Sequence, residues 1–303
     1  MKKIIHNNLI WTDYFKIDQQ QASELKEQFG LPQAVFDELV PRQTRAKIEE
    51  YNNFLYMVMH FPVHNEQKRE TRPLELDFII TRDEIVTIHG GTIPALKEFF
   101  EGCADHDDLK NQYFKNAGYL LLSMLDKLID SSLPMLDHIQ EKIEQIEERR
   151  FRGEERELLM EIAVVKHDII DFRRSIKPQR SVLNILAKKA PRFLGAESDY
   201  LVQEVIGSNL RVWNVLENMK ETIESLEETN NSLLSYKISD IMKILTIVSF
   251  ITFPLSVIAG LFGMNVYDAV GFTKNPNTWW IILTIMGSAT VLMVVYFKKR
   301  KWF

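Results

Sequence analysis

The sequence predicts an N-terminal α/β domain, followed by long helices and two membrane-spanning helices at the C-terminal end. Residues 1–110 hold short segments rich in Val, Ile, Phe and Tyr between helical stretches, a composition typical of strands. No proline occurs from 192 to 253, which favours one very long helix. Residues 244–267 and 275–297 contain no charge. Each is long enough to cross a hydrocarbon core of about 30 Å.

The charge balance excludes one class of partner. The net charge is -5, and no basic stripe occurs outside the C-terminal tail, so we expect no nucleic-acid partner. Cys103 is the only cysteine. It can form no disulfide within the chain, which fits a reducing cytosol, and we assign it no role.

The charges that flank the two spans predict their orientation. The basic run 298–301 follows the second span, and Lys237 and Lys243 precede the first, whereas the loop between the spans carries only Asp268 and Lys274. Basic residues concentrate on the cytoplasmic side of membranes. We therefore expect a multi-pass protein of the cell membrane with both termini in the cytoplasm.

The N-terminal domain, residues 1–110, is predicted to contain a sheet. Its strands are expected at 54–63, 74–81 and 84–90. The first residues begin with two lysines, but His6-Asn7-Asn8 interrupts the apolar run, so this segment does not resemble a signal peptide.

Residues 111–198 are predicted to form a helical hairpin. Its arms are expected at 135–150 and at 155–176, just before Pro178, with a turn at 151–153.

A long helix from 199 to 265 is predicted to continue from the cytosol into the first span, with Ser198 as N-cap. Its apolar residues recur every seven positions, typical of lengthwise helix packing on copies of the chain or on neighbouring helices. The recurring residues are Val205, Val212, Met219, Leu226 and Leu233. An external loop at 266–278, a second span at 279–297 and a basic tail at 298–303 complete the organisation.

Small and polar residues of the first span fall on one helical face at steps of three or four. The expected pore-lining residues are Ser239, Met242, Leu245, Thr246, Ser249, Phe253, Ser256 and Gly260. Hydroxyls there would meet hydrated ions, and Met242 and Phe253 would form apolar constrictions. Small residues also allow close helix packing, so the same face fits either role. Two spans cannot enclose a pore, so a conducting path needs several chains.

The run IMKILTIVSFITFPLSVIAGLFGMNV, the second span and the terminal KKRKWF resemble the CorA family of magnesium transporters. GLPQAVFDELV, PLELDFIITRDEIVTIHG and SIKPQRSVLNIL extend the resemblance into the soluble part. It implies a funnel-shaped homopentamer in the lipid bilayer whose first span lines a pore. Divalent metal ions would be its partners, with Mg²⁺ both transported and regulatory.

The resemblance assigns the selectivity filter to Gly263, Met264 and Asn265. The C-terminus of a helix carries roughly half a negative charge, which would attract cations to the outer mouth. Asn265 would add amide oxygens that hydrogen-bond the water shell that Mg²⁺ gives up reluctantly. In many members the following loop has a Met-Pro-Glu-Leu stretch. Here Asp268 is the loop's only acid, at a different place.

The resemblance also implies a regulatory metal site between neighbouring cytosolic domains. The matching positions are Glu38 and Glu204, both glutamate where the usual pattern has aspartate. We expect cytosolic Mg²⁺ to bridge Glu38 of one protomer to Glu204 of the next and to hold the pore closed.

Other functions remain open. Transport of Zn²⁺, Co²⁺ or Ni²⁺ is the alternative within the family, and a membrane-tethered signalling or scaffold protein is the alternative from another class. An enzyme is not expected, because no convincing Ser-His-Asp, Cys-His or metal-ligand spacing occurs. No GxxxxGK[ST] loop is present to supply energy from a nucleotide.

Overall fold

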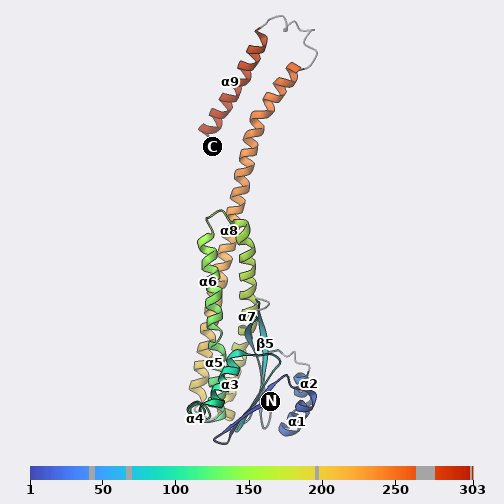
Figure 1. Cartoon of the computed structure of the whole chain (residues 1–303), viewed down its shortest axis with the longest axis vertical. Helices are drawn as coiled ribbons and strands as arrows, with labels where there is room; N and C mark the ends of the chain where they lie inside the picture. The colour runs from blue at the N-terminus through green and yellow to red at the C-terminus, as the bar shows by residue number, and fades with distance from the viewer. Residues whose placement is uncertain (41–44, 66–69, 195–197, 264–276, 301, 303) are drawn as a thin grey trace. The chain divides into compact units, whose positions relative to one another are not determined.

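A computed structural model describes residues 1–40, 45–65, 70–194, 198–263, 277–300 and 302. The chain divides into two units, Met1–Glu228 and Thr229–Phe303. The first contains the sheet and most helices, and the second contains the two candidate membrane spans. Figure 1 shows the elements in chain order.

The N-terminal unit is built on a six-stranded sheet with the order β1-β2-β6-β5-β4-β3. Neighbouring strands are antiparallel except β2 and β6, which are parallel. The strands are β1 Lys2–His6, β2 Leu9–Phe15, β3 Lys47–Glu50, β4 Leu55–Asn65, β5 Glu70–Ile80 and β6 Glu84–His89. The three predicted strands are therefore confirmed as β4, β5 and β6.

The hairpin of β1 and β2 was not predicted. Asn7 and Asn8 have φ angles of 49° and 64°. Two residues with positive φ form the turn that matches the twist of paired strands, and Asn tolerates this conformation well. The polar interruption in the N-terminal sequence is thus a hairpin turn.

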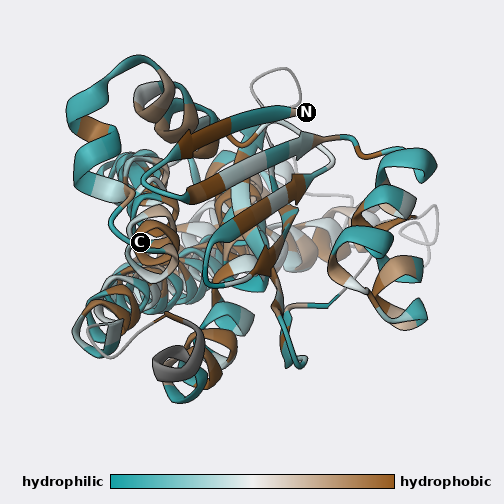
Figure 2. Cartoon of the chain, turned by 90° about the horizontal axis from the view of Figure 1, so that it is seen from below, coloured by the Kyte–Doolittle hydropathy of each residue, from teal (hydrophilic) through white to brown (hydrophobic). Residues whose placement is uncertain are grey.

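Helices cover both faces of the sheet. Side chains alternate along β4, so that Met57 belongs to one hydrophobic cluster and Tyr56 and Val58 belong to the other. The smaller cluster lies under α1 Gln19–Phe29 and α2 Gln33–Leu39. The larger one lies under α3 Pro94–Asp105, α5 Ala117–Asp130 and α7 Glu155–Leu194, and it contains Cys103, which is fully buried. Figure 2 shows α1 and α2 on one side of the sheet.

The long helices of the first unit pack alongside one another. They are α6 Leu133–Arg149, α7 and the N-terminal part of α8 Ser198–Gly263, whereas α4 Asp107–Tyr113 is a short helix that follows α3. The predicted hairpin is present, with Gly153 at a φ of 89° in the turn between α6 and α7 (Figure 1). The seven-residue repeat packs on the chain's own core, because Val205, Val212, Met219 and Leu226 are buried in its larger cluster.

The predicted end of the second arm at Ile176 is wrong, because α7 continues through Pro178 to Leu194. Proline removes one helical hydrogen bond, but packing around it offsets the loss. Ile176, Val182 and Leu183 are buried. Gln179 Nε2 also donates to the carbonyl oxygen of His60 at 2.7 Å, which ties the helix to β4.

The second unit contains the C-terminal part of α8 and α9 Thr278–Lys299. Both helices are long and apolar enough to cross a membrane. Pro254 lies inside α8, which remains helical to Gly263.

Candidate ion pathway and regulatory site

The predicted pore-lining residues lie on one face of α8 that is exposed in the single chain. Met242, Leu245 and Phe253 are exposed by 55, 56 and 72%. Ser239, Ser249, Ser256 and Gly260 are also exposed, and Thr246 is half-buried. A helix turns about 100° per residue, so these positions share one side. The chain itself leaves this side uncovered.

The opposite side of α8 faces the chain's own second span. Ile247 is only 2% exposed, and Ile251, Pro254 and Ile258 are half-buried. The ring of Phe250 lies edge-on to that of Phe297 in α9, with a centroid distance of 6.3 Å. A strip of α8 around Ile247 is therefore covered within the chain, whereas the side with hydroxyls and small residues is exposed, as are apolar residues such as Ile244 and Val248.

The hydroxyl groups on the free face are oriented by the helix itself. Thr246 Oγ1 donates to the carbonyl oxygen of Met242 at 2.7 Å, and Ser249 Oγ donates to that of Leu245 at 2.8 Å. A hydroxyl has one hydrogen and two lone pairs. With the hydrogen used inside the helix, each oxygen presents an acceptor, which suits the water shell of a cation.

The outer end of α8 lies at Gly263, the last helical residue that the structure describes. Met264 and Asn265 of the predicted filter lie outside the described residues. Among the described residues, a Cβ at Gly260 or Gly263 would meet no atom within 4 Å beyond the adjoining residues and the backbone of the same helix. Packing against the described part of the chain therefore does not require glycine at these two positions.

Glu38 lies in α2 and is held by a lysine of the same chain. Lys47 Nζ is 2.8 Å from its carboxylate and 3.0 Å from that of Glu49. Burial lowers the pKa of Lys47, but hydrogen bonds to Glu38 and Glu49 outweigh this effect, so the pKa is raised. A cation that binds Glu38 must therefore compete with an ammonium group.

Glu204 lies in the first turns of α8, at a pocket of about 230 Å³ between α5 and α8. The other lining residues are Tyr113, Tyr119, Leu122, Ser123, Asp126, Lys127, Leu201 and Val205. Asp126 accepts a hydrogen bond from Ser208 Oγ at 2.7 Å. Carboxylate oxygens, here those of Glu204 and Asp126, are among the ligands that hard divalent cations prefer.

Sequence reasoning missed Asp126. The signal available was the pair Asp126 and Asp130, about one helical turn apart within the region 111–198 that is predicted to be helical. Burial, and then the charge of Asp126, raise the pKa of Asp130. Arg211 NH2 lies 3.7 Å from Asp130, so a cation of the chain partly compensates this acidic pair.

The structure does not bring Glu38 and Glu204 together within one chain. Among the residues that it describes, no group of three or more His, Cys, Asp or Glu could hold a metal ion. A metal site that joins the two glutamates across neighbouring chains stays a prediction.

Comparisons with known proteins agree on one family. The family described as CorA-like Mg²⁺ transporter protein matches residues 6–299. The chain is 26% identical to the cobalt/magnesium transport protein CorA of Thermotoga maritima, an alignment that covers 91% of this chain and 78% of the relative. It is 24% identical to the putative metal ion transporter YfjQ of Bacillus subtilis, and that alignment covers 97% of this chain and 89% of the relative.

Solved structures show the same fold. The complete structure of the CorA magnesium transporter from Methanocaldococcus jannaschii matches with a TM-score of 0.85 at 22% identity, covering 100% of this chain and 95% of the other. The full-length CmaX protein matches with a TM-score of 0.74 at 19% identity, and the match covers 97% of this chain and 89% of the other.

Proposed function

The chain belongs to the CorA-like Mg²⁺ transporter family, and on that premise we propose that it mediates Mg²⁺ uptake across the cell membrane. Members of the family are channels or transporters of divalent cations and not enzymes. Both termini would lie in the cytoplasm, as the basic flanks of the spans predict.

The observation that supports a pore most directly is the free face of α8. It combines exposed Ser249 and Ser256 with hydroxyl oxygens that act as acceptors, as at Thr246 and Ser249. One chain cannot enclose a path with two spans, so we propose a homopentamer in which five such faces surround the axis. Met242 and Phe253 would form apolar constrictions that control wetting.

The outer mouth would select the ion through the ring of Asn265. Amide oxygens bind the waters of Mg²⁺ without removing them, which suits a cation that dehydrates reluctantly. The helix ends add partial negative charge at the same mouth. A divalent cation that crosses inward gains about 4.6 kcal/mol per 100 mV, twice the single-charge value, so no nucleotide is needed.

Asn265→Ala tests the filter. We expect Mg²⁺ uptake into proteoliposomes, followed with an internal fluorescent indicator, to fall at least about tenfold, the effect of losing roughly 1.4 kcal/mol at the site. Asn277→Ala is the matched control, because it removes an amide just before α9 and should leave uptake near the parent rate. Full uptake by Asn265→Ala would exclude this filter.

We further propose that cytosolic Mg²⁺ closes the pore by binding between chains. Glu204 and Asp126 would supply one half of the site, and Glu38 of the next protomer the other half. The pocket at Glu204 supports this assignment because it collects oxygen donors near an exposed carboxylate. Lys47 would act as a competitor that releases Glu38 only when Mg²⁺ is abundant.

Variants of the regulatory site should weaken block by internal Mg²⁺ and leave the maximal flux unchanged. Glu38→Ala with Glu204→Ala removes both halves, and Asp126→Asn tests the residue found in the pocket. We expect the half-inhibitory Mg²⁺ concentration to rise in both variants, at least fivefold for the double variant. Glu221→Ala, an exposed acid of the same helix, is the control. An unchanged half-inhibitory concentration in the double variant would overturn the assignment.

Cobalt is a second candidate ion, because the Thermotoga maritima relative is named a cobalt/magnesium transport protein. Uptake of Mg²⁺, Co²⁺, Ni²⁺ and Zn²⁺ into the same proteoliposomes, with and without an imposed potential, separates the candidates.

A further inference from the structure

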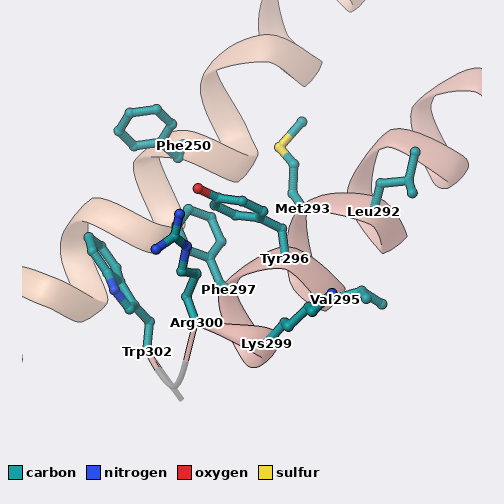
Figure 3. Close-up of a pocket in the computed structure, with 9 residues that line it drawn as sticks. All are labelled: Phe250, Leu292, Met293, Val295, Tyr296, Phe297, Lys299, Arg300 and Trp302. Atoms are coloured by element: carbon teal, nitrogen blue, oxygen red, sulfur yellow. The ribbon is translucent and has the colours of Figure 1, made fainter.

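An apolar pocket with a basic rim lies at the C-terminal end of α9. Its volume is about 740 Å³, within the range of about 300–1,000 Å³ that holds small ligands. Figure 3 shows its lining residues. They are Phe250, Leu292, Met293, Val295, Tyr296, Phe297, Lys299, Arg300 and Trp302.

Aromatic rings form one wall of this pocket. The Phe297 ring lies 6.3 Å from Phe250 and 5.6 Å from both Tyr296 and Trp302, measured between centroids. Phe297 is 8% exposed, whereas Tyr296 and Trp302 are 57 and 41% exposed. Tyr and Trp with an exposed polar end are typical of the depth where hydrocarbon meets headgroups.

Two cations border the apolar surface on different sides. In Figure 3, Arg300 points toward the rings of Tyr296 and Phe297, and Lys299 extends along Val295. The Arg300 guanidinium lies 5.9 Å from the centroid of the Tyr296 ring. A ligand that fits must therefore offer both an apolar body and a negative charge.

The described part of the second unit holds one acidic residue, Asp240, and it does not line the pocket. After Asp240, no Asp or Glu occurs in the part of the chain that the structure describes. The same segment of a second copy would bring more basic residues to this place and no carboxylate. A neighbouring membrane segment could fill the apolar wall, but it would leave Lys299 and Arg300 without a counter-charge.

We propose that this pocket binds an anionic phospholipid, with an acyl chain along Leu292 and Val295 and the anionic headgroup at the basic rim that Lys299 and Arg300 form. Basic and aromatic residues at the end of a span are the pair of features that hold such lipids at one leaflet. The inference rests on the membrane placement of α9 and does not depend on which ion is transported.

Quenching of Trp302 by brominated lipids tests the proposal in the full-length protein. Liposomes of zwitterionic phosphatidylcholine would contain either dibromo-phosphatidylglycerol or dibromo-phosphatidylcholine at equal fractions. The difference in emission between the parent and Trp302→Phe isolates this indole. Quenching of Trp279 and Trp280, at the other end of α9, shows whether the two brominated lipids are present around the protein in equal amounts. We expect the anionic lipid to quench Trp302 at a lower lipid fraction than the zwitterionic lipid does. The fraction needed for half of the maximal quenching should fall about fivefold for each basic residue that contacts the headgroup.

Lys299→Gln with Arg300→Gln should make the two lipids equivalent, and Lys298→Gln, outside the pocket, should preserve the preference. The parent should also lose its preference as KCl is raised, because salt screens exposed charges; this readout requires no variant. Equal quenching by both lipids in the parent would overturn the proposal. Absence of quenching by either lipid would also overturn it and would assign the pocket to contact with another chain.

Discussion

At the residue scale, Cys103 gives a direct test of burial. Its side chain is fully buried in α3, and burial raises the pKa of the thiol to about 11. The thiolate is the reactive form of cysteine. Raising the pKa from its ordinary value of 9.0 to about 11 lowers the fraction of thiolate at pH 8 about 100-fold.

We therefore expect folded protein to resist iodoacetamide at pH 8 and to react fully in guanidinium chloride. Intact mass measured over time reports the modification. Reaction of the folded chain at the denatured rate would contradict the burial of α3.

The polar face of α8 could be proposed from the sequence because the residues that form it are close in sequence. Helical spacing alone places Ser249, Phe253 and Ser256 together. Asp126 could not be assigned in this way, because its relation to Glu204 depends on how α5 packs against α8. Lys47 was also missed as a partner of Glu38, since their contact depends on how β3 packs beside α2 and not on helical spacing.

At the element scale, a buried amide pair joins α7 to α8. Asn209 Nδ2 donates to Gln179 Oε1 at 2.8 Å, and both side chains are nearly inaccessible. The contact fixes the register between the two helices at the point where α7 also bonds to β4. Arg173 strengthens the same interface, with its guanidinium 2.6 Å from Glu217 and 4.9 Å from the Trp213 ring.

Asn209→Ala should destabilise the N-terminal unit by about 1–3 kcal/mol, because Gln179 Oε1 would lose its donor while remaining buried. The thermal midpoint in detergent should fall by a few degrees. Asn218→Ala, an exposed position of α8, should leave the midpoint unchanged. Equal midpoints for the two variants would show that the amide pair contributes no stability.

The elements themselves were predictable where one strong local signal dominated. Apolar β-formers specified β4, β5 and β6, and charge-free length specified both spans. Local rules failed at Pro178, where packing around Ile176 and Val182 keeps α7 helical. They also failed at Asn7 and Asn8, whose polarity concealed a turn between strands.

At the scale of the whole molecule, the uncovered face of α8 predicts that the isolated chain is incomplete. Each chain has a mass of 35.5 kDa. Light scattering of the detergent-solubilised protein, corrected for bound detergent, should give the mass of five chains. A monomeric mass together with full ion flux would contradict a pore made between chains.

The single cysteine also makes the protein suitable for spectroscopy without further engineering. Because Cys103 is buried, a cysteine introduced at Ser249 would be the only site on each chain open to a nitroxide spin label. Dipolar distances between such labels would then come solely from symmetry-related copies. In a pentamer the distances should fall into two classes, one between adjacent chains and one between non-adjacent chains, and the two lengths should stand in a fixed ratio. The ratio reports the number of chains, and the lengths report the width of the pore. A change of the distances with Mg²⁺ would follow gating in the membrane.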